Sequence, residues 1–298
     1  MINGILGQYI NGNARVTILT NGTKIREIDG DTYEPAFPES MDVKICNRCN
    51  NGCSFCYANS TPDGKLGCLK WEFFKTLNPY TEIAVGGGNP LEHPALTSFL
   101  FELRNLGLIP NLTVHQNHFL GQYDYVKSLM DRELVFGVGV SVQHVTDELI
   151  EKLSTSANFV VHVIAGVMPI HELRKLYNHN IKLLVLGYKD LGRGKLETQA
   201  HAMSVGNEIE KFENELRANM DKFTVVSFDN LAIRQLHVQS WMTPEQWERF
   251  YLGDDGTCSM YVDLVRGEFA SSSVSETYYP ITDNIRQMFQ VVKEEKAE

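Results

Sequence analysis

The sequence lacks any apolar run long enough to cross a membrane, which takes about 20 residues. Its best candidate, Phe159 to Met168, ends after ten residues and contains His162. The first residues, MINGILGQYINGN, lack both a basic start and a long apolar stretch, so no secretory signal is visible. We therefore expect a cytoplasmic protein without a membrane partner.

The sequence also lacks an excess of positive charge and a set of cysteines suited to a disulfide scaffold. Its 27 basic and 37 acidic residues give a formal net charge of −10. Because binding to phosphates needs a cationic surface, this charge disfavours a nucleic-acid partner. Only six cysteines occur in 298 residues, yet four of them fall within eleven residues, between Cys46 and Cys56. In a reducing compartment such crowding indicates metal or redox chemistry.

Short apolar runs rich in β-branched residues recur along the chain. The starts of the middle five runs are separated by 29, 25, 23 and 22 residues, and each gap holds a helix-like stretch. This rhythm is typical of βαβ units and a parallel sheet. The runs are Asp42–Ile45, Glu82–Val85, Asn111–Val114, Phe136–Ser141, Phe159–Ala165, Ile181–Leu186 and Thr224–Phe228.

We predict an α/β fold in which residues 41–230 form a partial (β/α)6 TIM-like barrel, with function at the C-terminal ends of the strands. Residues 1–40 are expected to form an N-terminal β-hairpin extension, because two β-rich runs flank Asn21 and Gly22, a strong hairpin signal. Residues 231–298 are expected to form a C-terminal extension that covers the barrel. It would contain a hairpin in SMYVDLVRGEFASSS and a helix from about Ile281.

A cysteine-rich loop directly follows the first predicted core strand, where a parallel α/β fold places its active-site loops. Cys49, Cys53 and Cys56 in this loop have the spacing C-x3-C-x2-C. Thiolates held this close can converge on one iron–sulfur cluster, whose irons are ligated by cysteine sulfur. Three ligands on a four-iron cluster leave one iron without a protein ligand, open to a chelating substrate or cofactor.

Two other interpretations of the cysteines remain open. A zinc site could use all four, although common zinc patterns place about 12 to 20 residues between two ligand pairs, and only three separate Cys49 from Cys53. Alternatively the thiols are inert and buried. We expect Cys46 to be a buried strand-end thiol, the alternative being a fourth thiol near the cluster. Cys68 and Cys258 are isolated, and the sequence assigns them no role.

The cysteine loop and a second motif resemble those of the radical S-adenosylmethionine (radical SAM) enzymes. The loop shares the full C-x3-C-x2-C spacing and an aromatic residue, Phe55, just before the last cysteine. The next strand ends in a segment similar to that family's glycine-rich motif, whose backbone and acidic residue hold the amino group of SAM. This sequence has Asn89 where the family has Glu. The motif comprises Gly86, Gly87, Gly88, Asn89 and Pro90.

The resemblance implies a [4Fe-4S] cluster on Cys49, Cys53 and Cys56 and SAM bound by residues 86–90. It further implies SAM contacts at Ser141, Tyr188 and Arg193. The reduced cluster would cleave SAM to a 5′-deoxyadenosyl radical, which abstracts hydrogen from a small-molecule, peptide or protein substrate. The electron would come from a one-electron donor such as a flavodoxin or ferredoxin. The cofactor performs the difficult chemistry, and the protein supplies placement and exclusion of water.

Polar residues at later strand ends are candidates for substrate contacts, although any single one of them is more often a helix cap or a rim residue than a ligand. They are His115, Gln116, His118 and Gln143. The sequence assigns no residue a catalytic role. The alternative function is a non-enzymatic iron–sulfur or zinc protein that transfers electrons or serves as a scaffold. Its best support is Asn89, which lacks the charge of the usual carboxylate.

Overall fold

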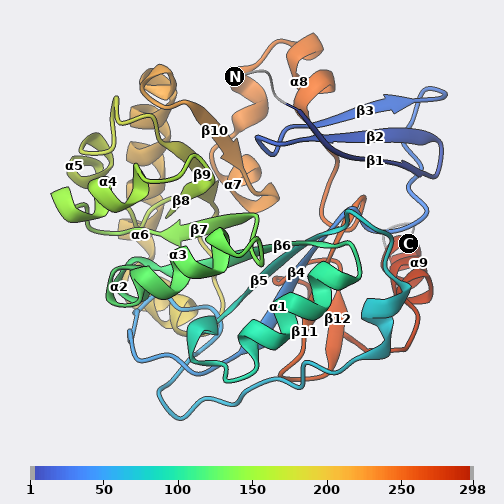
Figure 1. Cartoon of the computed structure of the whole chain (residues 1–298). Helices are drawn as coiled ribbons and strands as arrows, with labels where there is room; N and C mark the ends of the chain where they lie inside the picture. Colours follow the sequence, from blue (N-terminus) through green and yellow to red (C-terminus); the bar gives the residue numbers. More distant parts are fainter. Residues whose placement is uncertain (1–3, 296–298) are drawn as a thin grey trace.

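The computed structural model describes residues 4–295, except for the side chains of residues 201–203. Within this range the strands form two sheets, a small antiparallel one of order β1-β2-β3 and a large one of order β10-β9-β8-β7-β6-β5-β4-β11-β12-β13 (Figure 1). None of the described helices is long and apolar enough to span a membrane.

Seven consecutive parallel strands form the core of the large sheet, and they confirm the predicted α/β partial barrel. Each of the seven predicted apolar runs forms one of these strands. Among the described strands the sheet ends at β10 and β13, so the barrel is open. The seven strands are β4 (Ser40–Cys46), β5 (Glu82–Gly87), β6 (Ile109–His115), β7 (Gly137–Ser141), β8 (Phe159–Ile164), β9 (Lys182–Leu186) and β10 (Val225–Phe228).

Helices cover the outer face of the parallel strands (Figure 1). In α1 the buried residues Leu96, Phe99, Leu100 and Leu103 recur at helical spacing, which turns one apolar stripe toward the sheet. The helices between strands are α1 (Leu96–Asn105), α2 (Gln116–Gly121), α3 (Tyr123–Asp131), α4 (Asp147–Leu153), α5 (Ile170–Arg174) and α6 (Arg193–Ala218). After β10 come α7 (Asn230–Gln235), α8 (Pro244–Phe250) and α9 (Ile285–Glu295). The 3-10 helices are η1 (Glu72–Thr76), η2 (Pro90–Glu92), η3 (Met220–Lys222) and η4 (Val238–Trp241).

The N-terminal extension has one strand more than the predicted hairpin. The expected turn at Asn21 and Gly22 joins β2 (Ala14–Leu19) to β3 (Lys24–Ile28), and Gly22 has the positive φ of 88° that this turn needs. An unpredicted strand, β1 (Ile5–Asn11), pairs with β2 on the other side. The turn meets the N-terminal end of the barrel, where Nζ of Lys182 donates to the carbonyl of Asn21 at 3.3 Å.

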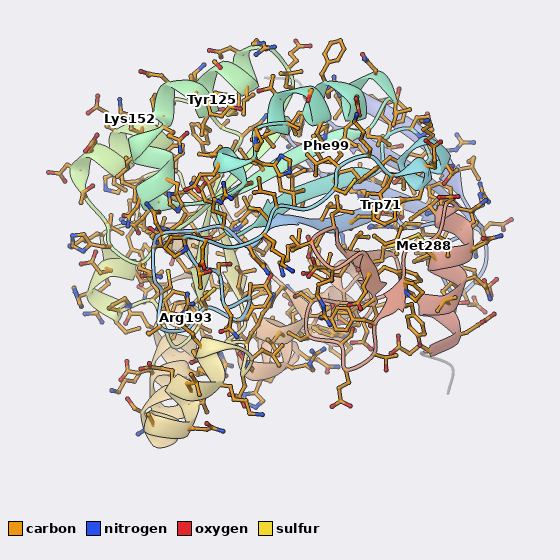
Figure 2. The ribbon with its side chains drawn as sticks, turned by 90° about the horizontal axis from the view of Figure 1, so that it is seen from below. Trp71, Phe99, Tyr125, Lys152, Arg193 and Met288 are labelled. Atoms are coloured by element: carbon orange, nitrogen blue, oxygen red, sulfur yellow. The ribbon has the colours of Figure 1, made fainter. Side chains whose placement is uncertain are left out.

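The predicted C-terminal hairpin is present and continues the main sheet. Its first strand, β11 (Ser259–Asp263), runs parallel to β4, and β12 (Glu268–Ala270) and β13 (Tyr279–Pro280) follow antiparallel. A buried ion pair joins β4 to β11, with Nζ of Lys44 2.9 Å from Oδ2 of Asp263. The last helix, α9, packs on η1 and buries Met288 near Trp71 (Figure 2).

Candidate active site

A cavity of about 670 Å³ runs along the inside of the partial barrel. It reaches from the cysteine loop at the C-terminal ends of the strands to Gly22 and Glu82 at their N-terminal ends. Its wall includes Gly137 and Gly139 of β7, which carry no side chain to fill the interior. In a closed barrel such positions carry packed core residues. Here the interior is space for ligands.

Most of the predicted site residues line this cavity, and four do not. Asn89, Pro90, Gln116 and His118 are buried outside it. The residues brought together on the cavity wall are Cys49, Cys53, Cys56, Gly86, Gly87, Gly88, His115, Ser141, Gln143, Tyr188 and Arg193. The first three strand ends thus meet on one wall, as expected for parallel strands whose carboxyl ends share an edge.

The three loop cysteines are free and partly exposed, and all face the cavity. Burial raises the pKa of the Cys49 and Cys53 thiols, while the positive charge of Arg193 acts in the opposite direction. Among the described residues, no three His, Cys, Asp or Glu side chains lie close enough together to hold a single metal ion. A four-iron cluster takes each cysteine on a different iron, so its ligands surround a larger space. The three thiols around one cavity fit such a group.

Arg193 holds the cysteine loop in place. Arg193 lies at the start of α6 (Figure 2). Its Nε donates to the carbonyl of Cys53 at 2.8 Å and its Nη1 donates to that of Ser60 at 3.0 Å. Its backbone N–H donates to the carbonyl of Cys56 at 3.0 Å. The preceding Gly192 allows this approach, since a Cβ there would lie 2.4 Å from a carbonyl oxygen of the loop. Arg193 therefore positions two of the three cysteines, Cys53 through its guanidinium and Cys56 through its backbone N–H.

Cys46 differs from the other three cysteines in its burial. It ends β4 with no exposed surface, and it is not part of the cavity wall. Burial raises the pKa of its thiol to about 11. The prediction of a buried strand-end thiol is confirmed.

The glycine motif is packed against the backbone of the cysteine loop. The N–H of Gly88 donates to the carbonyl of Cys46 at 2.8 Å, and the N–H of Asn89 donates to that of Arg48 at 2.6 Å. A Cβ on Gly88 would lie 2.3 Å from the Arg48 carbonyl oxygen, so a side chain cannot fit there. Gly87 adopts a φ of 123°, which L-residues rarely take. The glycines thus fix the two motifs relative to each other.

The side chain of Asn89 is used within the motif. Its Oδ1 accepts from the N–H of Leu91 at 3.3 Å, which caps η2, and its Nδ2 donates to Oε1 of Glu92 at 3.1 Å. Only 1% of Asn89 is exposed. The amide therefore supports the turn after β5, and a carboxylate lies three residues further along the chain.

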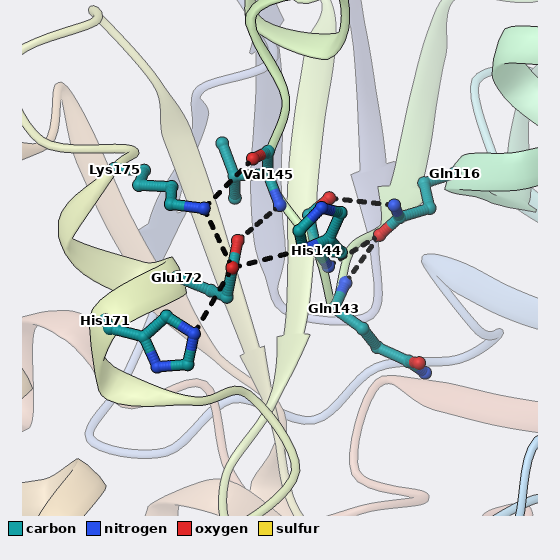
Figure 3. A network of polar contacts seen from close by, with 7 residues as sticks. All are labelled: Gln116, Gln143, His144, Val145, His171, Glu172 and Lys175. Atoms are coloured by element: carbon teal, nitrogen blue, oxygen red, sulfur yellow. Dashed lines mark hydrogen bonds and ion pairs between the residues drawn. The ribbon is translucent and has the colours of Figure 1, made fainter.

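Gln116 fixes the loop that follows β7 (Figure 3). Its Oε1 accepts from the backbone N–H groups of Gln143 and His144, and its Nε2 donates to the carbonyl of His144. On the other side, Glu172 accepts from the N–H of Val145 at 2.6 Å and from Nζ of Lys175 at 2.8 Å. With the loop held from both sides, the side chain of Gln143 is left to face the cavity.

Two histidines were predicted as substrate contacts, His115 at the N-cap of α2 and His118 within α2, and their surroundings differ. Nδ1 of His115 accepts from the N–H of Asn117, whereas its buried Nε2 has no hydrogen-bond partner among residues 4–295. Burial lowers the pKa of His115 to about 4, so its imidazole is neutral. His118 lies behind the cavity wall, with Nε2 3.5 Å from Sγ of Cys49.

The sequence interpretation missed His162 as a site residue. This histidine lies on the inner face of β8 and lines the cavity. A Cβ on Gly139 would lie 2.1 Å from its ring, so the glycine of β7 makes room for it. Burial lowers the pKa of His162 to about 4. The alternation of β8, which puts residues 160, 162 and 164 on one face, could have identified it.

The open parallel barrel with these two coupled loops has the radical SAM fold. Solved structures of SuiB from Streptococcus suis share it at 12–14% sequence identity. SuiB bound to precursor peptide SuiA matches with a TM-score of 0.59, over 87% of this chain and 65% of that chain. The S-adenosylmethionine complex matches with 0.56, over 86% and 66%, and SuiB alone with 0.55, over 97% and 86%. The chain thus spans just under two thirds of SuiB in the two complexes. No family model and no curated protein matches.

Proposed function

We propose that this protein is a radical SAM enzyme. Cys49, Cys53 and Cys56 would hold a [4Fe-4S] cluster, and Gly86–Gly88, Ser141 and Tyr188 would bind SAM. When bound, the two cofactors supply a 5′-deoxyadenosyl radical that abstracts a hydrogen atom from the substrate. The observation that carries the proposal is the convergence of three free thiols and the glycine motif on one hollow barrel of radical SAM fold.

The residues of this chain would orient the cofactors and exclude water. Arg193 and Gly88 hold the cysteine loop through backbone carbonyls, so the thiols are placed before cofactors bind. Neutral His115 and His162 face the cavity and can exchange hydrogen bonds with a ligand without adding charge. The Asn21–Gly22 turn lines the cavity at the N-terminal ends of the strands and would limit the access of water there.

We propose a small molecule, a peptide or a protein side chain as the substrate. The peptide class has the support that a structure of similar fold, SuiB, was solved with a precursor peptide. A flavodoxin or ferredoxin would supply the electron. Free thiols and a cluster suit a reducing compartment such as the cytoplasm. We keep residues 41–230 as the catalytic barrel, with 1–40 and 231–298 as its extensions.

The test is anaerobic reconstitution of the full chain with iron and sulfide, followed by reaction with SAM and a chemical reductant. We expect about four irons and four sulfides per chain, a cluster spectrum that changes when SAM is added, and release of 5′-deoxyadenosine. If the cluster forms but its spectrum does not change with SAM and no 5′-deoxyadenosine is released, the result would instead support an electron-transfer or scaffold role. One zinc without sulfide after anaerobic purification would support the zinc alternative.

A further inference from the structure

One contact behind the cysteine loop lies outside the cavity that the proposed reaction uses. Nε2 of His118 is 3.5 Å from Sγ of Cys49, within hydrogen-bonding reach of sulfur. The two residues are 69 positions apart in the sequence, so the fold creates this contact. His118 is only 8% exposed and is not part of the cavity wall. Its imidazole therefore approaches Cys49 from the protein side and cannot contact a substrate in the cavity.

The fold holds this imidazole in place. At the first turn of α2, Nδ1 of His115 accepts from the N–H of Asn117 at 3.2 Å, which caps the helix. The neighbouring Phe119 is fully buried and packs edge-on against Phe159, with ring centroids 5.1 Å apart. Helix α2 is thus fixed at both its cap and its buried face. The imidazole is presented to Cys49 without help from a metal.

When a cluster is bound, the protonation state of Cys49 decides which partner donates in the hydrogen bond with His118. A thiolate ligand carries no proton and can only accept, whereas a neutral imidazole has one donor and one acceptor nitrogen. A metal-bound Cys49 would therefore select the tautomer of His118 with its proton on Nε2. An N–H dipole aimed at the sulfur stabilises negative charge, and the reduced cluster carries one electron more than the oxidised cluster. Hydrogen bonds to sulfur are among the features that set cluster potentials.

We propose that His118 donates a hydrogen bond from Nε2 to the Cys49 thiolate and thereby raises the reduction potential of the cluster. The inference rests on the proposed function, because it requires a cluster on Cys49. His118 acts through this ligand, so it is a positioning residue and not a substrate contact. Its effect is to let a donor of given potential reduce a larger fraction of the enzyme.

The test is a potentiometric titration of the reconstituted full chain, without SAM, followed by EPR. We expect His118→Leu to lower the equilibrium constant for one-electron reduction at least tenfold, which is a shift of about 59 mV toward more negative potential. His118→Gln keeps an N–H donor and should recover part of the shift. The control His179→Leu removes an exposed histidine and should match the wild type.

A second measurement needs no variant. In wild-type protein labelled with ¹⁵N-histidine, pulsed EPR of the reduced cluster should detect a histidine nitrogen and a nearby proton that exchanges in D₂O. A histidine that only fills space would give no nitrogen coupling through the hydrogen bond, whereas an exchangeable proton can also come from the backbone N–H of Asn51, which bonds to Cys49. Equal potentials in loaded wild type and His118→Leu, or absence of the histidine nitrogen coupling in loaded wild type, would overturn the inference and leave the proposed function standing. A wild-type chain that takes up no iron and sulfide would overturn both.

Discussion

The two ends of the barrel are stabilised by different kinds of contact. At the C-terminal ends of the strands, backbone carbonyls of the cysteine loop accept from Arg193 and Gly88, and the Gln116 amide holds the loop after β7. At the N-terminal ends, the fully buried carboxylate of Glu39 receives Lys24 and Arg26 of β3. The comparison shows that the cysteine-loop end is held mainly through backbone carbonyls and a buried amide, while ion pairs at the far end join the small sheet to the barrel.

The largest expected effect comes from a substitution in the cysteine loop, at the C-terminal ends of the strands. Cys53→Ala removes one of three proposed ligands, and losing only a partner of a ligand already costs about 10–100-fold in metal affinity. We therefore expect more than about a 100-fold loss of iron, sulfide and 5′-deoxyadenosine formation, with little change in the stability of the apoprotein. Cys68→Ala, at an exposed thiol, is the matched control. Full cluster content in Cys53→Ala would refute its role as a ligand.

The second largest effect is on stability and comes from the ion pairs at the N-terminal ends of the strands. Glu39→Gln leaves Lys24 and Arg26 facing a neutral amide, and breaking a buried pair on one side costs about 3–5 kcal/mol. We expect a loss of this size in the free energy of unfolding, measured with urea, while cluster content stays normal at 25 °C. The exposed Glu27→Gln on β3 is the control. A Glu39→Gln variant that is as stable as the wild type but binds less cluster would contradict the assignment of these ion pairs to stability and of the cysteine loop to cluster binding.

The third effect is on the pH dependence of stability and comes from Glu172, which holds the loop after β7. Burial alone would raise the pKa of Glu172, but hydrogen bonds from Lys175 and from the N–H of Val145 lower it to about 2. A depressed pKa means that Glu172 stabilises the fold above its unfolded pKa near 4.5, and that this contribution is lost as pH falls toward 2.

Glu172→Gln should therefore destabilise the protein at neutral pH by about 1–3 kcal/mol and flatten the pH dependence of stability between pH 4.5 and 2. Urea unfolding at a series of pH values measures both. The exposed Glu151→Gln on α4 should keep the wild-type slope in that window. An equal slope for Glu172→Gln would show that the carboxylate is not stabilised as described.

The smallest effect tests the hollow interior. In Gly139→Ala the new Cβ would collide with the ring of His162, and we expect a cost of about 1 kcal/mol, at the lower end for overpacking, because the ring can turn into the cavity. The double variant Gly139→Ala/His162→Ala should recover most of this stability. Additive losses in urea unfolding would mean that the two residues do not share the space.

The sequence predicted the strands of the barrel well because most of them bury one face under helices and line the cavity with the other, and both environments select the β-branched runs that mark β4 to β10. It did not predict β1. Its segment ILGQYIN contains Gly7 and ends at Asn11, so the local pattern is weak, and the strand forms by pairing with β2.

The spacing of the cysteines and the family resemblance of the glycine motif identified the loops that meet at the cavity, because parallel strands bring their carboxyl ends to one edge. It could not predict which polar groups are already committed to partners. Gln116 and Asn89 looked like ligand contacts in the sequence. Their hydrogen bonds go to His144 and Glu92, on turns whose positions depend on the whole fold.

The pairing of β11 with β4 sets an order of events during synthesis. Lys44 and Asp263 are 219 residues apart in the sequence. Until the ribosome has released the segment around Asp263, the strand that leads into the cysteine loop has one edge without its neighbour, and contacts at such separation form late. The cysteine loop therefore gains its finished support only after the segment around Asp263 has been translated, and a cluster assembled earlier would meet an incomplete wall.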